Sequence, residues 1–315
     1  MNRLSIISPE ADQYGELIAQ QALPELEISL YSSPEQARGN VAQSDILLGY
    51  PAYLSEVLDE AQQLKWVQST SAGVEELCSK GLRRDYTLSN IKDVFGPIMS
   101  EYVFGYIMTL ERNILAFHQH QQQREWVQWD HYPYRRLSDL TLGVVGVGSI
   151  GKHIAATGKH FGMRVLGMKR SADPVAGVDE MYTLDQLEVF LPQVDYLVMV
   201  LPSTAGTYHF VNDDFLALMK AGSTFINVGR GSTVDEDALL RALQQGTVKN
   251  AVLDVLETEP LPESSPLWQQ PNVLITPHVS ALSFPAHIVT VFLDNYQRYL
   301  RGEPLTNIID FERGY

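Results

Sequence analysis

The stretch GVVGVGSIG, residues 143–151, constrains the fold more than any other part of the chain. An apolar run typical of a strand ends at Gly146, and a helical pattern begins at Ser149. The glycines at 146, 148 and 151 suit a tight turn, a close backbone approach and close helix–strand packing, each of which excludes a larger side chain. The stretch therefore predicts strand, turn and helix, the first unit of a doubly wound α/β sheet.

The alternation of apolar runs and helical patterns continues after this motif. Helices are expected from Ser149, Thr183, Asp213 and Asp235, and residues 183–186, TLDQ, fit a capping box at the second of these starts. Strands are expected at LGVVGV, MRVLGM, YLVMVL, TFINV, NAVLDV and NVLITPH. Strands joined in this way by helices describe a doubly wound parallel sheet.

A shorter series of the same kind precedes this sheet. Apolar runs start at Leu4, Leu26, Asp45 and Leu64, separated by polar stretches that can form short helices. This rhythm indicates a second sheet of the βα type.

Two helical segments connect the two series. Residues 98–123 have apolar residues at helical spacing in their first half, which predicts one long helix followed by an aromatic, polar arm. A helix over residues 284–300 is expected to return to the first domain. We therefore expect α/β architecture with two Rossmann-like, doubly wound parallel-sheet domains and a cleft between them: residues 1–97 plus 283–315, and residues 98–282.

Composition excludes several classes of partner. A chain of 315 residues with 45% hydrophobic content can fill two cores, whereas a net charge of −15 repels nucleic acid and anionic membranes. The apolar runs are far shorter than the ~20 residues that span a bilayer, and the N-terminal MNRLSIISPE lacks the features of a signal peptide. The single cysteine, Cys78, points to a reducing compartment and reads as a packing residue. We expect a cytoplasmic protein.

The glycine motif also predicts a ligand. Ser149 and Ile150 would offer N–H groups at the positive end of the helix dipole, where a pyrophosphate can approach over Gly148. Glycines alone also serve ordinary turns, but the strand–turn–helix context of Gly146 and Gly151 favours a dinucleotide.

The next strand ends on an unusual charge for a dinucleotide site. About 20 residues beyond the glycine motif, a carboxylate commonly accepts hydrogen bonds from the adenosine ribose. Here Lys169, Arg170 and Ser171 occupy that place. Two cations and a hydroxyl can bind a 2′-phosphate, which predicts NADP(H) in preference to NAD(H). The alternative is that the two cations only face solvent.

Three further stretches end strands of the same sheet: NVGRG, LDVLETEP and TPHVS. Because the carboxyl ends of parallel strands line the ligand crevice, Arg230, Glu259 and His278 could converge there. His278 could donate a proton to a nascent alkoxide, Glu259 could hold its ring and raise its pKa, and Arg230 could bind a substrate carboxylate. Asp254 could orient this network or the nicotinamide amide.

Each of these residues also has a purely structural interpretation. Arg230 could cap a helix or pair with Asp235, Glu259 could be a loop carboxylate, and His278 could be a satisfied loop histidine. No metal site is expected, because no carboxylate or cysteine completes a ligand set around His118 and His120. The remaining histidines lack such a context and are expected to be surface or packing residues: His118, His120, His131, His153, His160, His209 and His287.

Seven stretches in order resemble the D-isomer-specific 2-hydroxyacid dehydrogenases. They are STSAGVEEL, FGPIMSEYVFGYIM, LTLGVVGVGSIG, VDYLVMVLPSTAGT, FINVGRGSTVDEDAL, AVLDVLETEPLPESSPLW and NVLITPHVSA. The resemblance implies that Arg230, Glu259 and His278 are the catalytic residues. It implies a substrate domain formed by the chain's two ends, a cleft that closes over the substrate, and a homodimer built by the helix and arm of residues 98–135.

The resemblance also implies further binding residues. The backbone at Ala72, Gly73 and Val74 would bind the substrate carboxylate, and Arg230 and His278 would also contact the substrate. Tyr50 would line the substrate site, where its ring would favour small substrates. Additional cofactor contacts are implied at Leu201, Pro202, Thr207, Val228, Gly229, Asp254 and Ser280.

Within this family, the cations after the second strand and the short chain resemble the NADPH-dependent glyoxylate and hydroxypyruvate reductases. We therefore expect reduction of a small 2-oxo acid to the D-2-hydroxy acid. A D-lactate or 3-phosphoglycerate dehydrogenase is the alternative, although phosphoglycerate needs cations near Tyr50 and Ser71, and none is nearer in sequence than Lys65. A catalytically silent, dinucleotide-sensing scaffold is a third possibility, against which the presence of all three catalytic residues argues.

Overall fold

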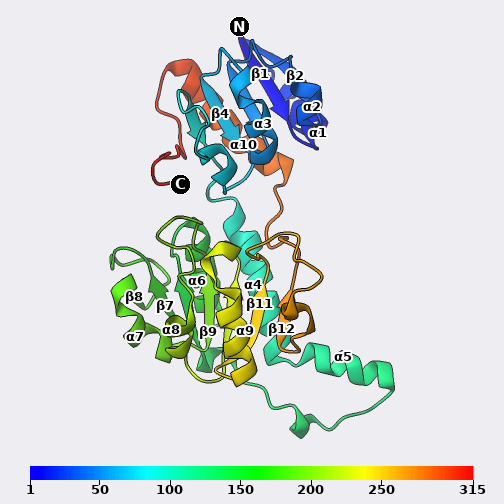
Figure 1. Ribbon diagram of the computed structural model, residues 1–315, viewed down its shortest axis with the longest axis vertical. Helices are drawn as coiled ribbons and strands as arrows, with labels where there is room; N and C mark the ends of the chain where they lie inside the picture. The colour runs from blue at the N-terminus through cyan, green and yellow to red at the C-terminus, as the bar shows by residue number, and fades with distance from the viewer. Residues whose placement is uncertain (315) are drawn as a thin grey trace. The chain divides into compact units, whose positions relative to one another are not determined.

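Residues 1–314 are described by the computed structural model of the chain, the side chain of Trp129 excepted, and they build two parallel sheets flanked by helices (Figure 1). One unit comprises residues 1–94 with the C-terminal segment from Leu282, and the other comprises residues 95–281. The predicted α/β class with two Rossmann-like parallel sheets is confirmed. The first boundary, predicted after residue 97, lies after Val94 because the connecting helix begins earlier than expected.

The first unit contains a five-stranded sheet in the order β2-β1-β3-β4-β5, parallel throughout. Its elements are β1 (Asn2–Ile7), α1 (Ala11–Ala19), β2 (Leu26–Tyr31), α2 (Pro34–Ala37), β3 (Ile46–Gly49), α3 (Pro51–Val57), β4 (Trp66–Ser69), β5 (Thr87–Ser89) and α10 (Pro285–Arg301). The four predicted strands are present. The fifth, β5, was not predicted because Leu88 is the one apolar residue among its three, so no apolar run marks it.

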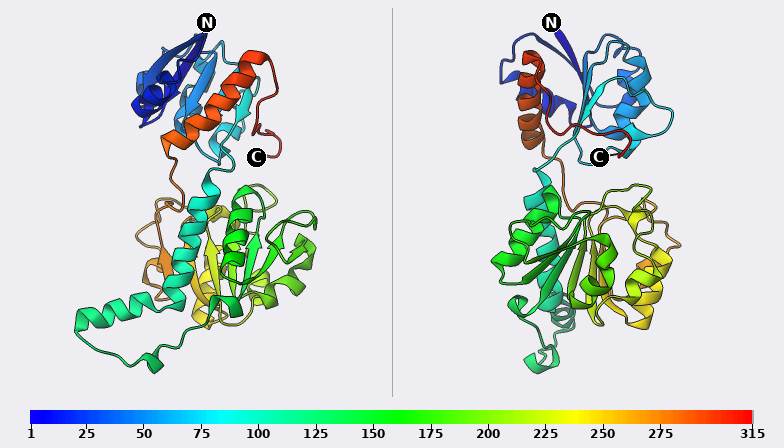
Figure 2. Two further views of the ribbon diagram at one scale, coloured as in Figure 1. Left: turned by 180° about the vertical axis from the view of Figure 1, so that it is seen from behind. Right: turned by 90° about the vertical axis from the view of Figure 1, so that its left-hand side faces the viewer.

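Helix α10 belongs to the first unit, as predicted from its sequence. It starts with Pro285 in its first turn and ends at Gly302, whose φ of 66° is the left-handed conformation typical of a helix C-terminus. The ring of Trp66 stacks on Phe292 at 5.3 Å and on Tyr299 at 5.8 Å. Figure 2 shows the helix lying across the sheet. The C-terminal segment thus completes the core of the N-terminal sheet.

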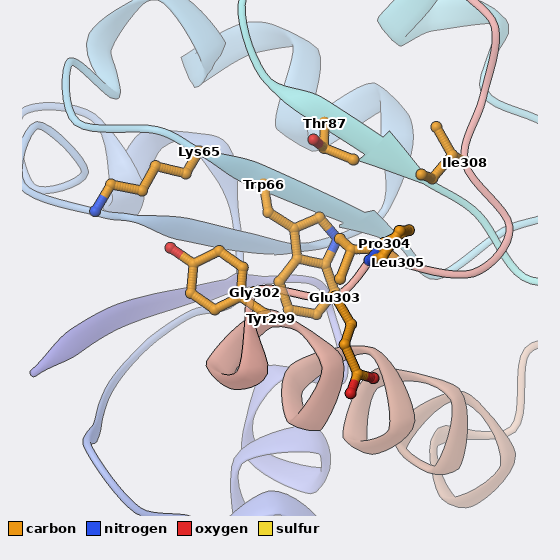
Figure 3. A pocket seen from close by; sticks show the side chains of 9 residues that line it. All are labelled: Lys65, Trp66, Thr87, Tyr299, Gly302, Glu303, Pro304, Leu305 and Ile308. Carbon is orange, nitrogen blue, oxygen red and sulfur yellow. The ribbon is translucent and has the colours of Figure 1, made fainter.

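A cavity of about 300 Å³ lies where α10 ends beside β4. Figure 3 shows the rings of Trp66 and Tyr299 next to each other in its wall. Its charged lining residues are already engaged, since Lys65 pairs with Asp45 at 2.8 Å and Glu303 pairs with Arg301 at 3.0 Å. The cavity belongs entirely to the first unit.

The second unit contains a seven-stranded parallel sheet in the order β12-β11-β10-β9-β6-β7-β8. Its strands are β6 (Thr141–Val145), β7 (Arg164–Met168), β8 (Glu180–Tyr182), β9 (Tyr196–Met199), β10 (Ser223–Asn227), β11 (Val248–Leu253) and β12 (Val273–Ile275). Its helices are α4 (Phe95–Glu111), α5 (Ile114–Gln123), α6 (Ser149–His160), α7 (Leu187–Phe190), α8 (Asp213–Ala217) and α9 (Glu236–Gln245). The right-hand view of Figure 2 shows α6 on one side of the sheet and α9 on the other.

The strand order reverses between β6 and β9. The chain moves outward from β6 through β7 to β8, and then crosses back to β9 on the other side of β6. In such sheets, ligands bind beyond the carboxyl ends of the strands at this switch point. The glycine turn after β6 and the loop after β9 therefore flank the expected ligand crevice.

One helix prediction needs correction. The helix expected over residues 98–123 is two helices, because Asn113 adopts a φ of 52° and separates α4 from α5. Asparagine tolerates this left-handed conformation better than most residues. At Thr183 the predicted capping box and helix start are present, and the helix there is a 3₁₀ turn followed directly by the four-residue α7. The strand β8, just before it, was not predicted.

The segment after α5 is fastened to the base of the sheet (Figure 1). Arg135 pairs with Glu111 at the end of α4 and lies 3.4 Å from Asp195, and the Tyr196 hydroxyl donates to Glu111 at 2.7 Å. Burial alone would raise the pKa of Glu111, but the hydrogen bonds from Arg135 and Tyr196 outweigh it and lower that pKa. A buried carboxylate thus anchors the arm.

Candidate functional site at the switch point

The turn between β6 and α6 leaves room for a phosphate group. Gly146 has a φ of 101°, and a Cβ there would come within 2.6 Å of a backbone oxygen, so the position requires glycine. Around Gly148, by contrast, no described heavy atom beyond its chain neighbours lies within 4 Å of where a Cβ would be. The first amide groups of α6, from Ser149 and Ile150, have no acceptor within the helix and stand at its N-terminus next to this turn. Gly151 packs against the carbonyl of Gly146. These residues fit a dinucleotide pyrophosphate.

The cationic residues follow β7, on the side of the switch point occupied by the glycine turn. Lys169 is half-buried and its backbone N–H donates to Tyr182 at 3.1 Å, whereas Arg170 and Ser171 are exposed. The Ser171 hydroxyl donates to the carboxylate of Asp173 at 2.6 Å. The negative charge of Asp173 therefore lies close to Ser171 in this corner.

The loop after β9 carries three of the expected cofactor contacts. Leu201 and Pro202 follow the strand directly. The Thr207 hydroxyl donates to the Pro202 carbonyl at 2.7 Å and accepts from the Thr204 N–H at 2.9 Å. Thr207 thus closes this loop upon itself, and its contact with a cofactor stays a prediction.

The turn after β10 is built by Asn227. Its amide group donates to the Arg230 carbonyl at 3.0 Å, while its side-chain oxygen accepts from the Gly229 N–H at 3.1 Å. The backbone of Val228 pairs with β9 at 3.1 Å. A Cβ on Gly231 would collide with the loop after β11, so glycine allows that loop to lie directly on this turn. Arg230 is held at the carboxyl end of β10 as a result.

Glu259 and His278 meet beyond β11 and β12. The Nδ1 atom of His278 lies 2.8 Å from Oε2 of Glu259, and Oε1 of Glu259 accepts from the Leu256 N–H at 2.9 Å. The backbone of His278, with a φ of 54°, is held by its N–H donating to the Asp254 carbonyl at 2.8 Å. Because Nδ1 faces the carboxylate, Nε2 is the ring nitrogen left to face a ligand.

The charges of these residues act on one another. The hydrogen bond to Glu259 raises the pKa of His278, and the negative charges of Glu259 and Asp254 add to this, although burial and Arg230 oppose it. Burial would raise the pKa of Glu259, but the hydrogen bonds from His278 and Leu256 and the charge of Arg230 lower it overall. Arg230 therefore lies within electrostatic range of both partners. The structure brings the three predicted catalytic residues together within the second unit.

Asp254 holds the loop that carries His278 through hydrogen bonds to its carboxylate. Its buried carboxylate accepts from the Thr276 hydroxyl at 2.6 Å and from the N–H groups of Val279 and Ser280 at 2.8 and 2.9 Å. The Tyr102 hydroxyl, on α4, lies 2.5 Å from that of Thr276. Asp254 thus holds the loop that carries His278, in keeping with the orienting role considered for it, whereas its contact with a cofactor stays a prediction, as does that of Ser280.

The predicted substrate residues lie in the first unit. Tyr50 precedes α3, is 46% exposed and packs edge-on against Tyr53 at 5.8 Å. The Ala72 carbonyl accepts from the Asn90 side chain at 2.7 Å, and Val74 is buried while Gly73 is half-buried. This loop follows β4, so it stands at the carboxyl end of its own parallel sheet.

One group of residues at the site was missed. Glu257 accepts a hydrogen bond from the Tyr208 hydroxyl at 3.0 Å, and its Oε1 lies 2.9 Å from Nε2 of His209. His209 was expected to be a surface or packing residue; its side chain is 32% exposed, and it pairs with Glu257, two residues before Glu259. The sequence signal was the first glutamate of the ETEP stretch, Glu257.

Two further features bear on the expected ligands. Among residues 1–314, no group of three or more histidine, cysteine, aspartate or glutamate side chains could hold a metal ion. In the same part of the chain, no helix combines the length and apolar character needed to cross a membrane.

Comparison with known proteins places this site in a family. The NAD-binding domain of the D-isomer specific 2-hydroxyacid dehydrogenases matches residues 104–280. A glyoxylate/hydroxypyruvate reductase A of Citrobacter koseri is 33% identical over 263 residues, which cover 81% of this chain and 83% of the relative.

Solved structures of similar proteins support the same family. A D-isomer specific 2-hydroxyacid dehydrogenase family protein from Aeromonas salmonicida is 44% identical, with a TM-score of 0.94 over 98% of this chain and 99% of that one. An NADPH-dependent glyoxylate/hydroxypyruvate reductase from Sinorhizobium meliloti, in complex with NADP and sulfate, is 27% identical, with a TM-score of 0.89 over 100% of both chains. The chain belongs to the D-isomer specific 2-hydroxyacid dehydrogenases.

Proposed function

We propose that the protein reduces a small 2-oxo acid of the glyoxylate or hydroxypyruvate type to the D-2-hydroxy acid, with NADPH as the reductant. The observation that carries this proposal is the 2.8 Å pair of His278 and Glu259, with Arg230 in electrostatic range, beyond the carboxyl ends of adjacent strands in a dinucleotide-binding sheet. The names of the Citrobacter and Sinorhizobium relatives support the same substrates.

The three residues divide the chemistry between them. The cofactor, when bound, supplies the hydride. Arg230 binds the substrate carboxylate in a charge-assisted, forked contact that also fixes the adjacent carbonyl. His278 donates the proton on Nε2 to the carbonyl oxygen as it becomes an alkoxide. Glu259 keeps the ring oriented and protonated, since its hydrogen bond to Nδ1 raises the pKa of His278.

The preference for NADPH rests on the corner after β7. Lys169, Arg170 and Ser171 stand where a ribose 2′-substituent is expected, and two cations stabilise a phosphate dianion there. The bound NADP of the Sinorhizobium relative supports this assignment. The hydroxyl of Ser171 would have to turn from Asp173 to donate to the phosphate.

The first unit is proposed as the substrate domain. The loop of Ala72, Gly73 and Val74 would bind the substrate carboxylate through backbone N–H groups, and Tyr50 would line the site. A bulky, half-exposed ring favours substrates with a small substituent at C2. Glyoxylate and hydroxypyruvate meet that condition better than phenylpyruvate.

The helix α5 and the arm after it are proposed to form a homodimer. None of the residues Ile114–Gln123 is buried, and large apolar side chains there and in the arm are exposed, among them Ile114, Leu115, Phe117 and Trp126. A second copy of the chain would cover this apolar surface. Sedimentation of wild type and Phe117→Glu tests this: the variant should sediment as a monomer, and a wild-type monomer would contradict the proposal.

A substrate panel tests the proposed activity. The absorbance of NADPH and of NADH is followed with glyoxylate, hydroxypyruvate, pyruvate and phenylpyruvate, and the product is assigned by chiral chromatography. We expect the highest kcat/KM with glyoxylate or hydroxypyruvate and NADPH, and a D-product from hydroxypyruvate. A preference for pyruvate would instead indicate a D-lactate dehydrogenase. A protein that binds NADPH and reduces none of the four would be a silent, cofactor-sensing scaffold.

A further inference from the structure

The carboxylate of Glu257 joins two loops of the second unit. Its Oε1 atom accepts the Tyr208 hydroxyl at 3.0 Å and lies 2.9 Å from Nε2 of His209. The rings of Tyr208 and His209 are stacked, with centroids 4.0 Å apart and planes 12° from parallel. The loop after β9 is therefore tied to the loop after β11 by one carboxylate oxygen that serves two donors.

The turn that carries Arg230 is part of the same connection. The His209 N–H donates to the Ser232 carbonyl at 2.9 Å, and the hydroxyls of Ser203 and Ser232 lie 2.9 Å apart. The missing side chain of Gly231 lets the backbone around Leu256 rest directly on this turn. The loops that follow β9, β10 and β11 are thus bound to one another immediately beside the site.

The backbone of Glu257 is fixed as well. Its N–H donates to Oε1 of Glu236, the first residue of α9, at 2.7 Å. Burial raises the pKa of Glu236, and the nearby charges of Glu257, Asp237 and Glu259 add to this, although the hydrogen bond from the Glu257 N–H opposes it. Both the main chain and the side chain of Glu257 therefore have assigned partners.

An isolated ion pair on a protein surface contributes little to stability. The hydrogen-bonded pair of His209 and Glu257, with side chains 32% and 34% exposed, would by itself add no more than such a surface pair. The position of the pair between two loops beside the site gives it a structural role. His209 adopts a φ of 48°, a conformation that costs a non-glycine residue energy and persists only where neighbouring contacts hold it. In this backbone conformation, Nε2 of His209 lies 2.9 Å from Oε1 of Glu257.

We propose that Tyr208, His209 and Glu257 form a latch that positions Glu259 against His278. The latch holds residues 256–259 on the turn of Arg230, and the Leu256 N–H in turn holds Oε1 of Glu259. These are positioning residues that act through Glu259. The kinetic part of this inference rests on the proposed reduction of 2-oxo acids.

Opening the latch has a defined consequence. If residues 256–259 move away from the turn, Glu259 no longer holds Nδ1 of His278 at hydrogen-bond distance. The hydrogen bond to Glu259, the largest influence that raises the pKa of His278, is then lost. Burial and the charge of Arg230 still lower this pKa, and Asp254 is the negative group that still raises it. The proton donor would be lost at a lower pH than in the intact protein.

Glu257→Ala and Glu257→Gln separate the latch from ordinary packing. The alanine variant removes the acceptor, whereas the glutamine oxygen can still accept from Tyr208 and His209. Glu263→Ala removes an exposed acid from the same loop and serves as the matched control. For each variant, kcat and KM for hydroxypyruvate and the pH dependence of kcat/KM are measured, and the pKa of His278 is followed by NMR.

We expect Glu257→Ala to lower kcat about tenfold, equivalent to about 1.4 kcal/mol in the activation barrier. The pH at which kcat/KM falls on the alkaline side and the NMR pKa of His278 should both move to lower values in this variant. Glu257→Gln and Glu263→Ala should resemble wild type. His209→Phe keeps a stacked ring but removes the nitrogen that contacts Glu257, so it should show the same losses as Glu257→Ala. It serves as the test variant if Glu257→Ala does not fold.

An unchanged His278 pKa in Glu257→Ala and in His209→Phe would overturn the latch. So would a loss of kcat in Glu263→Ala equal to that in Glu257→Ala. If the wild-type protein reduces no 2-oxo acid, the proposed function fails, and the latch is still judged by the NMR pKa, which Glu257→Ala must lower.

Discussion

The imidazole of His278 and the carboxylate of Glu259 face each other at 2.8 Å across a separation of 19 residues in sequence. One ring nitrogen is thereby committed to Glu259, and the other is available for a substrate. The second oxygen of Glu259 is held by the Leu256 N–H at 2.9 Å, so the carboxylate cannot turn away without breaking a backbone hydrogen bond. This geometry suits a proton donor whose orientation is set before the substrate arrives.

Replacing His278 should abolish proton donation and spare cofactor binding. In His278→Asn we expect kcat for hydroxypyruvate reduction to fall about 10²- to 10⁴-fold, the range contributed by a general acid. The Kd for NADPH, measured by fluorescence titration, should change little, because the glycine turn and the cations after β7 are untouched. A variant that keeps wild-type kcat would remove His278 from the mechanism.

Reversing the charge at Lys169 should change the cofactor. In Lys169→Asp, a carboxylate would repel the 2′-phosphate and accept hydrogen bonds from the ribose hydroxyls, so the ratio of kcat/KM for NADPH over NADH should fall. Lys249→Asp, an exposed change on β11, is the control and should leave the ratio unaltered. An equal ratio in both variants would mean that the 2′-phosphate is bound elsewhere.

Removing the charge of Asp173 should act in the opposite direction. Its carboxylate holds the Ser171 hydroxyl at 2.6 Å and competes for it with a phosphate. In Asp173→Asn we expect KM for NADPH to fall about threefold at low ionic strength, with less effect at high salt because the charges are exposed. KM for NADH should stay constant, and a parallel fall for both cofactors would argue against a specific effect on the phosphate.

The arm should loosen when Arg135 is removed. Arg135→Met leaves the buried Glu111 carboxylate without its main cation, a kind of change that destabilises proteins by about 3–5 kcal/mol when both partners are fully buried. Because the Arg135 side chain is 42% exposed, we expect a loss of about 2 kcal/mol in urea unfolding. Arg136→Met, which breaks only the exposed pair with Asp139, should unfold like wild type.

Much of the fold could be predicted because its signals are local. Alternating apolar runs and glycine positions define the strands and the turn after β6, and each is readable within a window of about ten residues. The elements that were missed carry weaker signals. Strands β5 (TLS) and β8 (EMY) contain one and two apolar residues, whereas the equally short β12 (VLI) is wholly apolar and was predicted. The break at Asn113 depends on a left-handed backbone conformation that asparagine can adopt but does not require.

The candidate site was predictable where its residues lie on the loops that follow adjacent strands. Arg230, Glu259 and His278 come at or near strand ends, and the rule that parallel strands present their carboxyl ends together is enough to group them. Glu257 and His209 were missed because their pairing depends on how two loops fold over the turn at Gly231. Such contacts between loops leave no periodic pattern in the sequence.

The central claim is that Glu259 keeps His278 protonated so that His278 can donate the proton in 2-oxo acid reduction. Since the pKa of His278 is raised, the protonated form persists to higher pH than in an isolated histidine, and reduction should fail only as the pH rises through that pKa. The most direct test is an NMR titration of His278 beside the pH dependence of kcat/KM for hydroxypyruvate, in wild type and in Glu259→Gln. We predict that the two curves share one pKa in wild type, above the ordinary value for histidine, and that both move to lower pH in the variant. A kinetic pKa that differs from the NMR pKa, or that stays in place when Glu259 is changed, would contradict the account.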